Sequence, residues 1–192
     1  GITKDTLDPP GGKIERNKLG NPTGILIDNA IDLLYKHLPK TSEVNLSAYL
    51  NAAGEQLLSE GITSVHDAGI NKAEYDYFIK RVAEHSLPVR IYPMIMATSP
   101  VLRKLLETGH VQDQYDWLSI RSVKAYGDGA LGSRGAALLK PYSDAPDNSG
   151  LLVTREADLK PLFDLVLGSG FQLNFHAIGD RANRLALDQF AD

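Results

Sequence analysis

Residues 118–126 read LSIRSVKAY, a stretch in which apolar side chains, two of them β-branched, are interspersed with polar ones and which predicts a β-strand. Residues 127–150 are rich in Gly, Ser, Asp and Pro, which predicts a long loop after that strand. The apolar spacing then predicts a helix over residues 156–169, a second strand over residues 171–176 and a second helix over residues 180–190. This alternation of strands and helices decides the fold class.

The same alternation extends toward the N-terminus. The patterns predict strands over residues 62–66 and 89–96, and helices over residues 72–84 and 100–108. A parallel strand pair needs a crossover of about a dozen residues or more, so helices between successive strands indicate parallel pairing. We therefore predict an α/β fold of about four parallel βα units, which is typical of a (β/α)₈ barrel segment or of a doubly wound sheet.

The beginning of the chain has another character. Residues 1–24 are rich in Gly and Pro and predict a loop or a short hairpin. Apolar spacing predicts a helix over residues 25–39 and another over residues 45–61. We accordingly predict a loop and helical lead-in over residues 1–60 and the βα units over residues 61–192.

Composition limits the function classes. The chain has 192 residues, a formal net charge of −4 and no Cys. The weak negative charge gives no reason to expect nucleic acid or an anionic membrane as a partner, and no apolar run approaches the ~20 residues that cross a bilayer. The absence of Cys excludes disulfides and thiolate metal sites, and it fits a cytoplasmic protein.

The two ends predict an internal piece of a longer protein. The chain opens at Gly1 in turn-like sequence without an initiator Met, and it stops at Asp192 just after the last predicted helix. A complete (β/α)₈ barrel also needs roughly 250 residues. The alternative is a complete small domain with a trimmed tail.

Lys124 is the strand residue that packing alone explains least well. Strand residues of a parallel sheet tend to be apolar on both faces, so this lysine must reach solvent, pair with a carboxylate or be chemically modified. An amine that burial desolvates has a lowered pKa and can act as a nucleophile or base. The structural alternative is a lysine that extends to solvent and pairs with Asp128.

Polar side chains also follow two other predicted strands. His176 ends the last strand, where a neutral imidazole is suited to bind a metal or transfer protons, and a purely structural histidine fits equally well. Asp180 is either a site residue or a carboxylate that the helix N-terminus favours. His66 and Asp67 at the first strand have the same alternatives, and the sequence Asp-Ala-Gly favours a turn for Asp67.

Three segments resemble the amidohydrolase superfamily, in particular the branch of enzymes similar to N-substituted formamide deformylase. They read GITSVHDAG over residues 61–69, VKAYGDGALGSR over residues 123–134 and NFHAIGDRA over residues 174–182. They are similar to the second-, fourth- and fifth-strand segments of that family, and the Gly- and Pro-rich residues 1–26 resemble the stretch before its second strand. The resemblance runs through essentially the whole chain.

The resemblance implies a distorted (β/α)₈ barrel that holds one or two divalent metals, usually zinc. In that family a His-x-His pair ends the first strand, an often carboxylated lysine ends the fourth, histidines end the fifth and sixth, and an aspartate ends the eighth. Lys124 is then the candidate fourth-strand metal ligand, which carboxylation would convert into an oxygen ligand, and His176 is the fifth-strand ligand. Asp128 and Asp180 are expected at the pocket rim as catalytic residues that support the ligands or contact substrate.

The activity so implied is hydrolysis of C–N bonds, amide- or formamide-like but not peptide bonds, by metal-activated water acting on a small-molecule substrate. The His-x-His pair, the sixth-strand His and the eighth-strand Asp have no counterpart here, and a catalytic zinc usually needs three protein ligands. We therefore expect this piece by itself to be inactive, and to cover its open strand edges and apolar faces by self-association.

Two alternatives remain open. One is a non-catalytic α/β module that binds a small ligand or a partner at its strand ends. The other is a complete flavodoxin-like domain that uses its own topological switch point. Within the long loop, Arg134 and Tyr142 are further candidates for contact with a substrate.

Overall fold

The computed structural model describes residues 1–191, which cluster into two compact units. The first unit contains Gly1–Pro39, Tyr126–Phe163 and the chain from Phe175 onward. The second unit contains Lys40–Ala125 and Asp164–Asn174. The units are therefore interleaved along the chain, and the predicted division after residue 60 stays a prediction.

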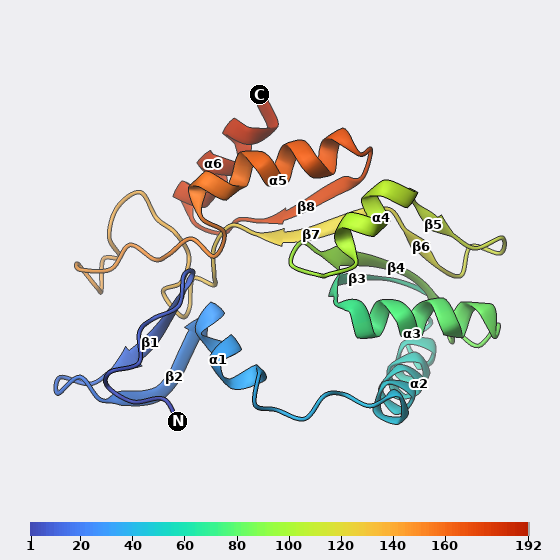
Figure 1. Cartoon of the computed structure of the whole chain (residues 1–192), viewed down its shortest axis with the longest axis horizontal. Helices are drawn as coiled ribbons and strands as arrows, with labels where there is room; N and C mark the ends of the chain where they lie inside the picture. Colours follow the sequence, from blue (N-terminus) through green and yellow to red (C-terminus); the bar gives the residue numbers. More distant parts are fainter. Residues whose placement is uncertain (192) are drawn as a thin grey trace. The chain divides into compact units, whose positions relative to one another are not determined.

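An antiparallel hairpin opens the first unit (Figure 1). Its elements and their followers are β1 (Gly12–Arg16), β2 (Pro22–Asp28), the 3₁₀ helix η1 (Asn29–Ile31) and α1 (Asp32–Tyr35). The expected hairpin is confirmed, but the helix expected over residues 25–39 is wrong for residues 25–28. A turn closed by a hydrogen bond from the Asn17 N–H to the Asn21 carbonyl reverses the chain, so the apolar run that follows pairs with β1.

A four-stranded sheet carries the βα units. Its strands are β3 (Ser64–Ile70), β4 (Arg90–Met96), β7 (Ser122–Tyr126) and β8 (Gln172–His176), and they lie in the order β3-β4-β7-β8. β3 pairs with β4, and β4 with β7, in parallel. The predicted α/β class with a parallel sheet is confirmed.

Five longer helices alternate with these strands. They are α2 (Glu43–Ser59), α3 (Lys72–Ala83), α4 (Leu102–Thr108), α5 (Glu156–Gly168) and α6 (Asp180–Ala191). Local sequence explains where two of them begin. The Ser42 side chain accepts the N–H of Asn45 at the start of α2, and Asn71 forms a capping box with Glu74 at the start of α3. All five lie close to their predicted ranges.

The strand β3 is longer than predicted and contains a residue that was expected in a turn. Parallel pairing with β4 continues past residue 66, with Asp67 opposite Pro93 and Ile70 opposite Ile95. The expected turn at Asp67 is therefore wrong. Ladder pairing with a neighbouring strand outweighs the local turn preference of an Asp-Ala-Gly sequence.

The predicted strand over residues 118–126 is divided in two. Its beginning forms β6 (Ser119–Ile120), which pairs antiparallel with β5 (Val111–Gln112), and its end forms β7. This small antiparallel pair was not expected, because two residues are too few to show a pattern.

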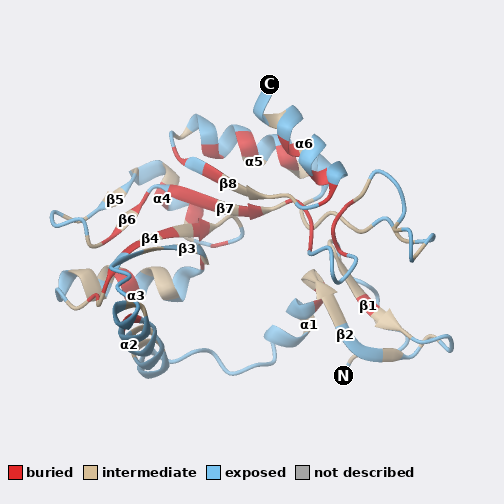
Figure 2. Ribbon diagram, turned by 180° about the vertical axis from the view of Figure 1, so that it is seen from behind, coloured by how far each residue is buried: buried red, intermediate tan, exposed pale blue. Residues whose placement is uncertain are grey.

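Burial within the second unit is concentrated in the strands (Figure 2). Ile95 of β4 and Val123 of β7 have no exposed surface, whereas α2 is exposed over most of its length. The buried residue of α2 is Gly54, which faces Pro88. No helix within residues 1–191 is long and apolar enough to cross a membrane.

Candidate functional site

Lys124 lies in β7 of the second unit with a half-buried side chain. Its Nζ donates to the Ala125 carbonyl at 3.4 Å, and it has at least one further interaction. A Cβ atom on Gly69 would lie at an ordinary contact distance of 3.6 Å from Lys124 Cγ but only 2.8 Å from Met96 Sδ, so the close approach at this glycine is to Met96. Burial lowers the pKa of the Lys124 amine, as the sequence predicts for a desolvated strand lysine. Its role as a metal ligand stays a prediction.

Asp67 in the same unit is a second titratable group with an altered acidity. Its side chain is half-buried in β3; burial raises the pKa of its carboxyl, and the negative charge of Glu74 raises it further. The neighbouring His66 is exposed and stacks on Tyr92 with ring centroids 4.7 Å apart. Burial thus favours the neutral form of both Asp67 and Lys124.

Asp128 of the first unit is fully buried instead of lying at a rim as expected. Its carboxylate accepts three backbone N–H groups, from Ala137 at 2.8 Å, Ile178 at 2.9 Å and Gly179 at 2.7 Å. These bonds join the loop after β7 to the connection between β8 and α6. Asp128 thus holds backbone in place, and the catalytic role expected for it stays a prediction.

His176 ends β8 in the first unit with 30% of its side chain exposed. Its Nε2 lies 4.0 Å from Oδ1 of Asp128, and its ring centroid lies 5.3 Å from that of Tyr126. The Gly127 N–H donates to the His176 carbonyl at 2.8 Å, which anchors the backbone of the histidine. An anchored, partly exposed imidazole can bind a metal or exchange protons.

Asp180 is exposed at the first position of α6. Its Oδ1 accepts the Leu139 N–H at 2.8 Å, which links the long loop to the helix start. The two loop residues considered for substrate contact are also engaged within the first unit. Arg134 pairs with Asp144 at 2.7 Å, and the Tyr142 hydroxyl donates to the Ala136 carbonyl at 2.8 Å. A catalytic role for Asp180 stays a prediction.

Asp28 is a residue of the first unit that sequence reasoning missed. It ends β2 with φ 50°, and its Oδ2 is buried without a hydrogen-bond partner. Burial raises the pKa of the Asp28 carboxyl, the negative charge of Asp128 raises it further, and His176 lowers it. If Ile25–Ile27 had been assigned to a strand, Asp28 would have stood out as an acidic residue at a strand end. The helix expected there made this pattern invisible.

The described residues do not form a complete metal site. Within residues 1–191, no group of three or more His, Cys, Asp or Glu side chains is arranged to hold a metal ion. Lys124 and His176 are two candidate ligands, one fewer than a catalytic zinc usually takes from its protein. The role of His176 as a metal ligand stays a prediction, as does that of Lys124.

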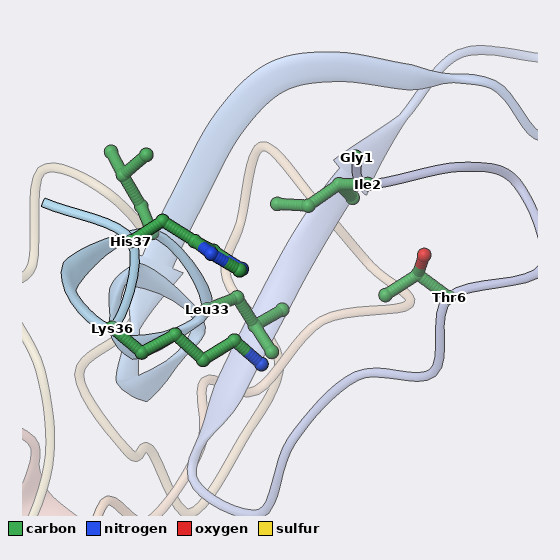
Figure 3. Close-up of a pocket in the computed structure, with 7 residues that line it drawn as sticks. Gly1, Ile2, Thr6, Leu33, Lys36 and His37 are labelled. Atoms are coloured by element: carbon green, nitrogen blue, oxygen red, sulfur yellow. The ribbon is translucent and has the colours of Figure 1, made fainter.

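A cavity of about 490 Å³ in the first unit is lined by none of these residues (Figure 3). Its lining consists of the N-terminal segment and the region of α1, with Gly1, Ile2, Thr6, Leu33, Leu34, Lys36 and His37. None of these was a predicted site residue, and His37 is exposed. The cavity gives no support to the site proposed at the strand ends.

Comparison with known proteins identifies the relatives of this chain. The model of the amidohydrolase family matches residues 1–192. The protein LONG AFTER FAR-RED 3 of Arabidopsis thaliana is 33% identical over 202 residues, which cover 99% of this chain and 34% of that protein.

Two solved structures are similar in fold and sequence. An uncharacterized metal-dependent hydrolase from Pyrococcus horikoshii OT3 shows 31% identity and a TM-score of 0.72, over 84% of this chain and 32% of that one. Another from Pyrococcus furiosus shows 26% identity and a TM-score of 0.73, over 96% of this chain and 38% of that one. The chain spans about a third of the length of these relatives.

Proposed function

Because the chain belongs to the amidohydrolase family, we propose that it is part of a metal-dependent hydrolase that cleaves C–N bonds other than peptide bonds. The observation that carries the proposal is the half-buried Lys124 in a parallel strand, with its pKa lowered by burial. A half-buried lysine is unusual in a parallel strand, where side chains tend to be apolar, and the family resemblance implies a metal ligand at this strand.

The proposal assigns metal binding to Lys124 and His176, with the remaining ligands supplied from elsewhere in the intact protein. Zinc is the metal proposed, because imidazole and oxygen ligands suit it and the chain contains no Cys. Such a metal supplies an activated water. Within this chain, Asp128 holds the backbone that follows His176, and Asp180 ties the long loop to α6.

The strand order supports a (β/α)₈ barrel in the intact protein. The order β3-β4-β7-β8 follows the sequence without reversal, which is how neighbouring strands of a barrel are arranged. A flavodoxin-like sheet instead reverses its strand order at a switch point. We propose that β3 and β8 pair with further strands of the barrel, or with another copy when those strands are missing.

Metal analysis of the intact protein tests the proposal directly. We expect the purified protein to contain zinc, and expect Lys124→Ala and His176→Ala each to lose most of it, because each removes a ligand. Lys104→Ala and His37→Ala are matched controls at exposed positions and should retain the metal. A parallel screen with N-substituted formamides and simple amides should show hydrolysis that follows the zinc content.

Two results would count against this assignment. Unaltered zinc in both Lys124→Ala and His176→Ala would remove these residues from the metal site. An intact protein that binds no metal and hydrolyses no C–N substrate would favour a non-catalytic module that binds a small ligand at its strand ends.

A further inference from the structure

We propose that Asp28, at the end of β2, is a positioning residue that orders the backbone directly after His176. The inference rests on the proposed function, because His176 is there the candidate metal ligand. The residues involved all belong to the first unit, and their contacts connect the hairpin to the histidine.

The first step is a close fit between the Asp28 carboxyl group and two glycines. A Cβ atom on Gly129 or on Gly135 would overlap this carboxyl group. Both glycines are buried, and the Gly129 N–H donates to the Gly135 carbonyl at 3.3 Å. The Asp28 carboxyl group therefore occupies the space that a side chain at either position would need, and it packs against the base of the long loop.

The second step connects this loop to the segment after His176. Asp128, adjacent to Gly129, accepts the N–H groups of Ile178 and Gly179, and it also accepts the N–H of Ala137. Gly179 in turn packs so closely on Ala137 that a Cβ atom would overlap the Ala137 backbone. A shift of the loop base would therefore weaken the hydrogen bonds of the Ile178 and Gly179 amides.

The third step is electrostatic. The pKa of the Asp28 carboxyl responds to the charges of both Asp128 and His176, after the larger effect of its burial. Charges influence one another's pKa in this way only over short distances, because solvent and salt screen the interaction between charges that are far apart. Asp28, Asp128 and His176 thus share one electrostatic environment.

Asp28 occupies this place at the expense of fold stability. Its φ of 50° and ψ of −127° are a backbone conformation that side-chain-bearing residues rarely adopt. Its Oδ2 is buried with no hydrogen-bond partner. Two unfavourable features at one residue, near a candidate site, support a role for Asp28 in the site instead of in folding.

The surrounding backbone enforces the unfavourable conformation. Asp28 is opposite Gly12 in the hairpin ladder, and the next residue, Asn29, is held on both sides. The Asn29 N–H donates to the Gly11 carbonyl at 3.1 Å, and its side chain donates to the Val153 carbonyl at 3.3 Å. Strain of this kind persists only where neighbours fix the chain, as they do here.

Hydrogen exchange in the intact protein tests the proposal without any substrate. Asp28→Gly removes the carboxyl group that packs on the loop base, and we expect the amides of Ile178 and Gly179 to exchange about tenfold faster. In Asp28→Asn the amide keeps the shape and tolerates positive φ, so exchange should stay close to wild type. Asp32→Gly, the same change at an exposed residue of α1, is the matched control and should alter neither amide.

Zinc binding gives the second readout, measured by competition with a chromogenic chelator. We expect Asp28→Gly to bind zinc about tenfold more weakly and Asp28→Asn to bind it like wild type, because ordering behind a ligand affects metal affinity by roughly this factor. The proposed role of Asp28 would be wrong if the Ile178 and Gly179 amides exchange at the wild-type rate in Asp28→Gly. It would also be wrong if Asp28→Gly and Asp28→Asn lose zinc affinity equally. A wild-type protein that takes up no zinc would overturn the proposed function, while the exchange rates still decide whether Asp28 orders residues 177–179.

A compensating substitution provides an independent check. Gly135→Ala adds a methyl group where the Asp28 carboxyl group lies, so it should accelerate exchange in the wild-type background. In the Asp28→Gly background the same methyl group can refill the vacated space, and exchange should slow relative to Asp28→Gly alone. Gly132→Ala, at a glycine with open space around it, is the control. Additive effects of Gly135→Ala and Asp28→Gly would contradict direct contact between the two positions.

Discussion

The carboxylate of Asp128 accepts the backbone N–H of Gly179 at 2.7 Å, across 51 residues of sequence. The same carboxylate binds the N–H groups of Ile178 and Ala137, and it is shielded from solvent. The loop after β7 and the turn after His176 are irregular, so these N–H groups have no strand partner. The buried Asp128 carboxylate accepts their hydrogen bonds instead. Together with the bond from the Gly127 N–H to the His176 carbonyl, it links the loop after β7 to the turn that follows His176.

Replacing this carboxylate should be severely destabilising. Asp128→Ala leaves three N–H groups without their acceptor, two of them in the turn after His176, so we expect a loss of about 3–5 kcal/mol in the free energy of unfolding. Urea denaturation of the intact protein measures it. Asp180→Ala removes an exposed carboxylate that binds Leu139 and should lose much less. Equal losses in the two variants would show that Asp128 does not hold the loop.

The raised pKa of Asp67 predicts that the stability of the fold decreases as the pH rises. Its carboxyl has a raised pKa in the folded chain, so the folded state binds the proton more tightly than the unfolded state. Stability is then fully retained below the unfolded pKa, about 3.9, and falls as pH rises through the folded pKa.

Asp67→Asn removes this penalty. We expect a higher Tm than wild type at pH 7 and a difference that shrinks toward about pH 3, below the ordinary aspartate pKa. Tm measured between these pH values is the test, with Glu55→Gln at an exposed position of α2 as control. A difference that is constant with pH would mean that titration of Asp67 is not its cause.

Lys124 should contribute to function while opposing stability. Because burial lowers the pKa of its amine, the folded state disfavours the charged form, and the penalty is largest below the folded pKa. Lys124→Met keeps the stem and removes the charge, so we expect Tm at pH 7 to stay level or rise while metal content falls. The advantage in Tm should shrink as the pH approaches the ordinary lysine pKa of 10.5.

Lys104→Met, at an exposed position, is the control for both measurements on Lys124. A Lys124→Met protein that is strongly destabilised would indicate that the amine makes a structural contact that outweighs its desolvation. Retained metal in that variant would argue against Lys124 as a ligand.

Gly54 should resist a change that ordinarily strengthens helices. A glycine inside a helix is less stable than alanine by about 0.5–1 kcal/mol. A Cβ atom on Gly54 would lie 2.5 Å from the Cβ and Cγ atoms of the rigid Pro88 ring. We therefore expect Gly54→Ala to lower Tm, whereas Glu55→Ala on the exposed side of α2 should leave it nearly unchanged. A Tm increase in Gly54→Ala would mean that α2 moves away from Pro88 without loss.

Local sequence patterns account for most of the fold. The helices from α2 to α6 and the strands β4 and β8 lie near their predicted ranges, because apolar spacing reports which face of an element is buried. The errors have a common cause. Ile25–Ile27 was assigned to a helix and Asp67 to a turn, and both join strands because a partner strand is available.

The site was only partly visible in the sequence. Lys124 and His176 stand out because each is a polar side chain in an apolar strand, and such an exception is visible within a few residues. Asp28 shows no such exception, since its place between two glycines more than 100 residues away depends on how the loop folds back onto the hairpin.

By itself, then, the sequence determined the alternation of strands and helices after residue 61, the α/β class and two candidate ligands, because these depend on residues that are close along the chain. Only the tertiary structure decided that Asp128 is a buried acceptor for distant backbone, and that Asp28 has a strained backbone and a buried Oδ2 atom without a hydrogen-bond partner. Hydrogen-bond partners and desolvation depend on which surfaces meet after folding, and no local pattern encodes that meeting.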